Sequence, residues 1–149
     1  MKKEFVPYEI ALELKELGFD EPCFAKYTVI PEDEIDWFVI TEQVITDKKS
    51  FGSNKNYNIK SFEEEGTISA PTFSHVFRWF REKYNLHHSI SILQRSCRYH
   101  FKIRTIECES DLKPFGDNKI IFEDGPRKKY EDIELDCLKK LIEIVKDGK

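Results

Sequence analysis

Basic side chains occupy every second position from residue 98 to residue 104, and this is the pattern in the chain most suited to chemistry. The row consists of Arg98, His100, Lys102 and Arg104. Alternate side chains of a β-strand point to the same face, so the row gathers positive charge on one side of a strand. Basic groups attract anions, and the serines predicted beside them offer hydrogen bonds without bulk. The pattern predicts a binding surface for an anionic macromolecule. The alternative is a solvent-facing sheet side whose cations pair with acidic residues or guard an edge against aggregation.

The row belongs to a basic segment within a mildly acidic chain. The 149 residues carry a net charge of −4, with a sequence pI of about 5.7. Residues 78–104 hold seven Lys and Arg against one acidic residue, whereas residues 1–77 hold eight against 15. Because a nucleic-acid-binding domain typically has a high pI, we expect a protein partner first and a nucleic acid second.

Two neighbouring residues of a predicted helix, Arg78 and Trp79, are second candidates for the contact surface. Trp79 falls outside the apolar arc of that helix and shares its flank with His75. An exposed Trp can anchor a protein partner or stack on a base. The alternative is that Trp79 packs beneath a loop, since Trp is highly buried on average.

Other chemistry finds little support in the sequence. Cys97 and His100 have C-x-x-H spacing, but strand alternation separates their side chains, and neither Cys108 nor the pair at 87–88 completes a tetrahedral zinc set. The four cysteines follow no disulfide spacing, so we expect mostly buried free thiols. No nucleophile elbow, P-loop or dinucleotide fingerprint is present. We therefore predict no cofactor or metal and favour a non-enzymatic protein. A small enzyme whose site assembles only in space is the third alternative.

Three helices are predicted to carry the framework, over residues 7–17, 71–84 and 131–146. The first should end at Gly18, with Phe19 packing back against Leu14. The second has Ser69 as its candidate N-cap and Asn85 as its stop. The third has an apolar arc near 180° wide, so we expect it to lie wedged between other elements.

Strands are predicted between the helices. Residues 22–30 and 35–46 should form an antiparallel hairpin, and residues 47–66 a long loop or an irregular extra strand at 57–62. Residues 88–94 and 98–106 alternate with period two, and residues 119–122 add a short strand. Pairing the two alternating segments about residues 95 and 96 places Ile92 opposite Tyr99, Ile90 opposite Phe101, Ser91 opposite His100 and Ser89 opposite Lys102.

These elements predict an α+β fold in one globular domain over residues 1–149. We expect three helices packed on an antiparallel sheet of four to five strands, in the order α-β-β-α-β-β-(β)-α. The sequence lacks the run of about 20 apolar residues needed for a transmembrane helix. It also lacks a signal-peptide pattern, so we expect a cytoplasmic protein that does not associate with a membrane. The oligomeric state is left open, because the broad apolar arc of the third helix suits either a core or a two-fold interface.

Three segments carry a resemblance to known proteins. They are PYEIALELKELGFDEPCF at 7–24, RWFREKYNLHHSI at 78–90 and DCLKKLIEIVK at 136–146. Together they resemble small bacterial proteins associated with phages and mobile elements, for which no activity is established. The matching residues are mainly those of predicted helix cores and caps. The resemblance therefore implies an accessory protein of such an element, and it assigns no site residue.

Overall fold

A computed structural model describes residues 2–29, 36–40, 67–93, 97–107 and 117–148 of the chain. The chain divides into two compact units, residues 1–72 and residues 73–149. The single domain inferred from the sequence stays a prediction. The predicted loop over 47–66 and the extra strand at 57–62 lie outside the described residues.

The first unit begins with a short 3-10 helix, Lys2–Glu4, followed by helix α1, Tyr8–Glu16. Gly18 has a φ of 84°, in the left-handed region, and the Phe19 amide donates a hydrogen bond to the Leu14 carbonyl at 2.9 Å. Phe19 is buried. This geometry confirms the predicted helix stop, because a glycine adopts the left-handed conformation that reverses the chain.

A three-stranded antiparallel sheet completes the first unit. Strand β1, Ala25–Val29, lies between β2, Asp36–Ile40, and β3, Thr67–Ser69. Ala25 pairs with Ile40, which confirms the predicted hairpin. The prediction that Ser69 caps the next helix is wrong: Ser69 pairs with Lys26 inside the sheet, and the helix begins only at Phe73.

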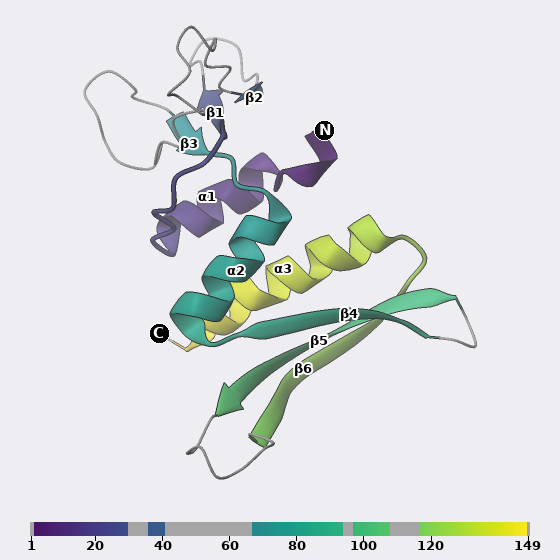
Figure 1. Ribbon diagram of the computed structural model, residues 1–149. Helices are drawn as coiled ribbons and strands as arrows, with labels where there is room; N and C mark the ends of the chain where they lie inside the picture. The colour runs from purple at the N-terminus through teal and green to yellow at the C-terminus, as the bar shows by residue number, and fades with distance from the viewer. Residues whose placement is uncertain (1, 30–35, 41–66, 94–96, 108–116, 149) are drawn as a thin grey trace, which may run out of the picture. The chain divides into compact units, whose positions relative to one another are not determined.

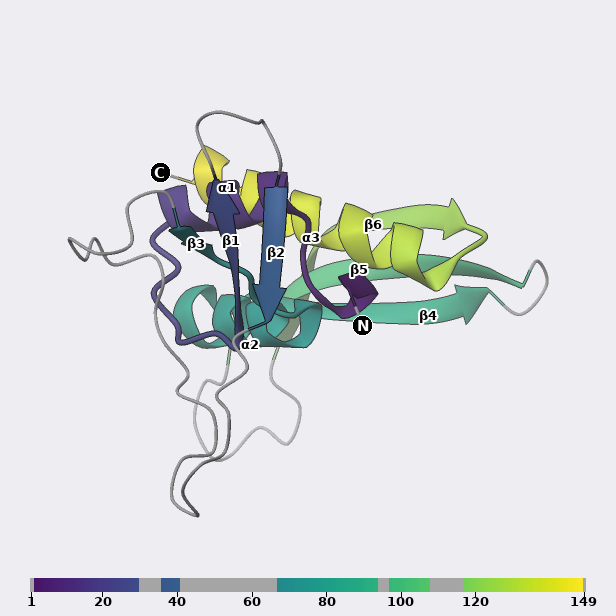
Figure 2. The same ribbon diagram turned by 90° about the horizontal axis from the view of Figure 1, so that it is seen from above.

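The second unit places a three-stranded antiparallel sheet beside two helices (Figure 1). Its elements are α2, Phe73–Tyr84; β4, His87–Leu93; β5, Arg98–Glu107; β6, Asp117–Arg127; and α3, Tyr130–Asp147. Strand β5 lies between β4 and β6. All four predicted pairs between β4 and β5 are present. Figure 2, seen from above, shows α3 in front of β5 and β6.

The core of the second unit lies between this sheet and its two helices. Phe101 and Ile103 of β5 are buried, and α3 packs against this strand. Helix α2 stops at Asn85, whose φ is 54°, as predicted. Helix α3 contacts α2 and all three strands of the sheet, as expected for a wedged helix. Its buried side chains are Ile133, Cys137, Leu138, Leu141, Ile142 and Val145.

Strand β6 is longer than the predicted strand at 119–122. It runs over 11 residues, and its pairing with β5 shifts between Tyr99 and Phe101 and again between Ile103 and Arg104. Each shift is a bulge, which changes the face to which the following side chains point. Period-two alternation therefore fails along β6, and the sequence pattern shows only a part of the strand.

The fold class is α+β, as predicted. The described strands form two antiparallel sheets of three strands each rather than one sheet of four to five. The difference arises because the hairpin of β1 and β2 pairs with β3 in the first unit, whereas β4 and β5 pair with β6 in the second.

Candidate binding surface on the second sheet

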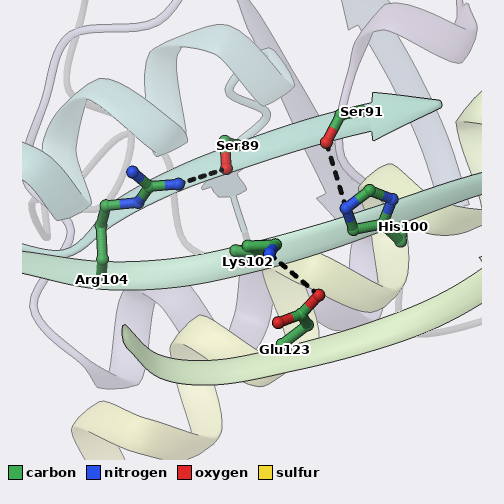
Figure 3. A network of polar contacts seen from close by, with 6 residues as sticks. All are labelled: Ser89, Ser91, His100, Lys102, Arg104 and Glu123. Atoms are coloured by element: carbon green, nitrogen blue, oxygen red, sulfur yellow. Dashed lines mark hydrogen bonds and ion pairs between the residues drawn. The ribbon is translucent and has the colours of Figure 1, made fainter. Parts of the chain in front are cut away.

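The predicted basic row lies on the side of β5 opposite the helices. Phe101 and Ile103 are buried in the core of the unit, so the residues that alternate with them along β5 point to the opposite side. We call this side of the β4–β6 sheet the outer face, and Figure 3 shows its polar side chains in front of the helices. By register, its described members include Arg98, His100, Lys102, Arg104 and Ile106 of β5, His87, Ser89, Ser91 and Leu93 of β4, and Ile120 and Glu123 of β6.

Two members of the basic row lean toward β4. The Arg104 guanidinium donates a hydrogen bond from Nη2 to the hydroxyl oxygen of Ser89 at 3.2 Å. The ring Nε2 of His100 lies 3.2 Å from the hydroxyl oxygen of Ser91, and these two atoms also form a hydrogen bond. A serine is short enough for the larger side chain to extend across it (Figure 3). The predicted serine neighbours therefore direct these side chains toward the β4 edge.

Lys102 leans the other way, toward β6. Its Nζ lies 3.1 Å from a carboxylate oxygen of Glu123, and the two side chains are 30% and 49% exposed. An ion pair this accessible to water contributes only about 0–1 kcal/mol. A competing carboxylate from a partner can therefore replace Glu123 at low cost.

The outer face keeps an excess of positive charge. Arg98, Lys102 and Arg104 are cationic, and in the described part of this face Glu123 is the acidic residue beside them. Arg98 is exposed, while Lys102 and Arg104 are partly exposed. This arrangement can hold carboxylates or phosphates by charge and by hydrogen bonds from the guanidinium groups.

Exposed aliphatic side chains accompany the cations. Leu93 is 39% and Ile120 is 51% exposed, and both belong to the outer face. Ile92 and Ile121 beside them are 56% and 41% exposed. The β6 bulge explains Ile120, because it turns that side chain to the polar side of the sheet. The sequence pattern missed these residues, since their exposure depends on where the sheet extends beyond its helices.

The two second candidates do not join this surface. Arg78 lies on α2, which packs on the opposite side of the sheet, and its Nε is 4.0 Å from a carboxylate oxygen of Glu82. Trp79 is only 3% exposed and makes edge-to-face contacts with Phe80 and Tyr84. The structure thus favours the packing interpretation of Trp79.

His88 pairs with Ile103 and therefore lies on the helix-facing side of β4, unlike His87 and His100 of the outer face. Its ring stacks on Phe77, with the two ring centroids 3.7 Å apart. Burial, with smaller contributions from the nearby Arg81 and His87, lowers the pKa of His88 to about 4. His88 is therefore neutral at pH 7 and contributes packing rather than charge.

The thiols give no sign of a nucleophilic site. Burial raises the pKa of Cys23 to about 12 and likewise that of Cys137 to about 12, so both are protonated at neutral pH. Cys23 and Cys137 are buried, in line with the expectation of mostly buried free thiols, whereas Cys97 is exposed and Cys108 lies outside the described residues. Across the described ranges, no three His, Cys, Asp or Glu side chains come together as a metal site.

Comparisons with known proteins give no family for the chain: no family model, no curated protein and no solved structure matches it. Among the helices of the described ranges, none has the length and apolar character of a membrane span.

Proposed function

We propose that this protein is a non-enzymatic accessory protein that binds an acidic protein partner through the outer face of the β4–β6 sheet. The observation that carries the proposal is the excess of cations over carboxylates on one accessible sheet face. A cytoplasmic location and a phage or mobile-element origin belong to the same proposal, supported by the sequence alone.

The exposed aliphatic residues favour a protein over a nucleic acid. A protein–protein contact combines an apolar centre with polar groups around it, and Leu93 and Ile120 supply apolar area beside the cations. A phosphate backbone would gain little from these two side chains. The acidic composition of the whole chain also opposes non-specific attraction to nucleic acid.

Selection from a displayed library of random 12-residue peptides tests the proposal without knowledge of the natural partner. We expect the enriched peptides to be rich in Asp and Glu. Their affinity should fall at least tenfold for the triple variant Arg98→Glu, Lys102→Glu, Arg104→Glu. Enriched peptides without acidic residues, or equal binding to this variant, would contradict the proposal.

A matched control variant separates the effect of charge on the outer face from the effect of the net charge of the protein. The variant Arg78→Glu, Lys139→Glu, Lys146→Glu makes the same change in net charge at exposed positions of α2 and α3. We expect it to change the affinity less than threefold. His100 is left intact in both variants, because the backbone at Gly125 packs closely against it.

A nucleic-acid partner is the second candidate, favoured by hydroxyls and cations lying side by side on the outer face. Labelled 20-nucleotide single strands and 20-base-pair duplexes, titrated at about 50 mM salt, distinguish the candidates. We expect no binding. Binding that weakens steeply with added salt, as counterion release requires, would favour the nucleic-acid function instead.

A further inference from the structure

We propose that the acidic partner binds by adding an extended segment to the sheet, as a fourth strand paired with β4. This inference rests on the proposed function and adds the mode of binding and the chemistry of the segment. In strand addition, the main chain of the ligand supplies hydrogen bonds and its alternate side chains supply specificity.

Strand β4 is an edge with little protection. In the described part of the chain it pairs with β5 alone. It is seven residues long, about the usual length of a strand. Natural proteins usually protect such edges with charged residues, proline or bulges. The sequence of β4, HHSISIL, contains no Lys, Arg, Asp, Glu or Pro, and its register with β5 is regular throughout.

The helix-facing side of β4 is incompletely covered. Ile90 and Ile92 point to the same side as Phe101, which is only 1% exposed. Ile90 is nevertheless half-buried, and Ile92 is 56% exposed. An added strand brings its own side chains next to these two residues. Apolar side chains on that face of the added strand would therefore remove more of the surface of Ile90 and Ile92 from water.

The outer side of β4 favours acidic side chains instead. A strand added beside β4 lies about 4.8 Å from it. The Arg104 guanidinium already extends over Ser89, and the His100 ring extends toward Ser91. A carboxylate next to Ser89 on the added strand can therefore reach the Arg104 guanidinium directly. The two sides together specify a segment in which acidic and apolar residues alternate.

A second copy of this chain fits the edge less well. Antiparallel pairing of β4 with its own copy would place two positively charged outer faces side by side, and like charges brought together at an interface are destabilising. An acidic segment from another protein has the complementary charge. We therefore assign the edge to a different chain.

The probe is the acetylated and amidated heptapeptide Glu-Val-Glu-Ile-Glu-Val-Glu, added to the full-length protein. Amide hydrogen exchange, followed by NMR, reports on the backbone of β4. We expect hydrogen exchange to slow at least tenfold on binding at the β4 amides that point away from β5, in the plane of the sheet. Two further peptides are N-methylated, one at its Glu residues and one at its apolar residues. Because only alternate amides of an added strand face its neighbour, one methylated peptide should lose binding and the other should keep most of it.

A substitution on the protein supplies an independent test. In Ser89→Glu, the new carboxylate lies within reach of Arg104 and repels the acidic peptide, so affinity should fall at least tenfold. The control is Ser74→Glu, at an exposed position of α2, which should change affinity less than twofold.

The outcomes separate the two proposals. Peptide binding that depends on Arg98, Lys102 and Arg104 but leaves β4 exchange unchanged would overturn strand addition and leave the proposed function intact. Failure of the heptapeptide and of every acidic peptide to bind would overturn both. Slow β4 exchange without peptide, accompanied by a dimer in analytical ultracentrifugation, would assign the edge to a second copy and also overturn the inference.

Discussion

Lys102 and Arg104 are neighbours in the basic row, but their side chains contact different groups of the protein. Arg104 contacts a neutral serine hydroxyl, whereas Lys102 lies against the Glu123 carboxylate. Within the described part of the chain Arg104 contacts this hydroxyl and no carboxylate, so a partner carboxylate displaces no anion of these residues. At Lys102 it must first compete with Glu123.

The first prediction concerns this competition at Lys102. Glu123→Gln removes the competing charge, so we expect the affinity for an acidic peptide, measured by calorimetry, to rise about two- to fivefold. Since the exposed pair contributes little, stability should change by less than about 1 kcal/mol. Glu143→Gln, which breaks the Lys140 ion pair in α3, is the control and should leave affinity unchanged. A weaker interaction in Glu123→Gln would show that Lys102 is not part of the surface.

The second prediction is a pH dependence of stability that arises at His88. Below pH 6.5 the unfolded chain takes up a proton that the folded protein binds only near pH 4, so stability falls as the pH is lowered through this window. A full shift corresponds to ~3 kcal/mol, and because His88 is only half-buried we expect a loss of about 1–2 kcal/mol.

Urea denaturation at pH 7.5 and pH 4.5 measures this loss. His88→Phe keeps a ring stacked on Phe77 but cannot titrate, so the variant should lose about 1–2 kcal/mol less than the wild type over the same pH range. Identical pH dependence in the two proteins would exclude His88 as the source.

At the scale of single elements, strand β6 is shaped by the close approach of Gly125 to β5. A Cβ atom at Gly125 would lie 2.6 Å from the Cβ and 2.9 Å from the Cα of His100. Neither of these atoms can move without shifting β5. The third prediction is that Gly125→Ala destabilises the protein by about 1–3 kcal/mol, as overpacking does. Gly148→Ala at the end of α3 is the control, because its nearest contact is 3.3 Å. Equal stability of the two variants by urea denaturation would contradict this account.

Local patterns predicted several elements well. Gly18 and Asn85 end their helices where a left-handed residue was expected, and period-two alternation gave the correct register of β4 with β5. In each case the deciding interaction is close in sequence. The position of the basic row on one strand face followed from the same alternation.

Other elements depend on contacts that a local pattern does not contain. Strand β3 is only three residues long and forms because it pairs with β1, about 40 residues earlier in the chain. The bulges of β6 turn Ile120 to the outer face. The candidate site was therefore predictable in its cations but not in its aliphatic residues.

On the scale of the whole molecule, the charge of the outer face is opposite in sign to the net charge of the chain. The chain is acidic overall, yet the outer face of one sheet is basic. Such a separation orients an approaching acidic partner toward the basic face, and its effect on association weakens as salt screens the charges. The same acidity discourages the chain from binding anions at other surfaces.

The most direct measurement is the dissociation constant of an enriched acidic peptide for three proteins: the wild type, the outer-face triple variant and the helix control with the same net charge. Our account predicts at least a tenfold loss for Arg98→Glu, Lys102→Glu, Arg104→Glu and less than a threefold change for Arg78→Glu, Lys139→Glu, Lys146→Glu. Equal losses in the two variants would mean that only net charge matters, and would contradict a binding site on the outer face.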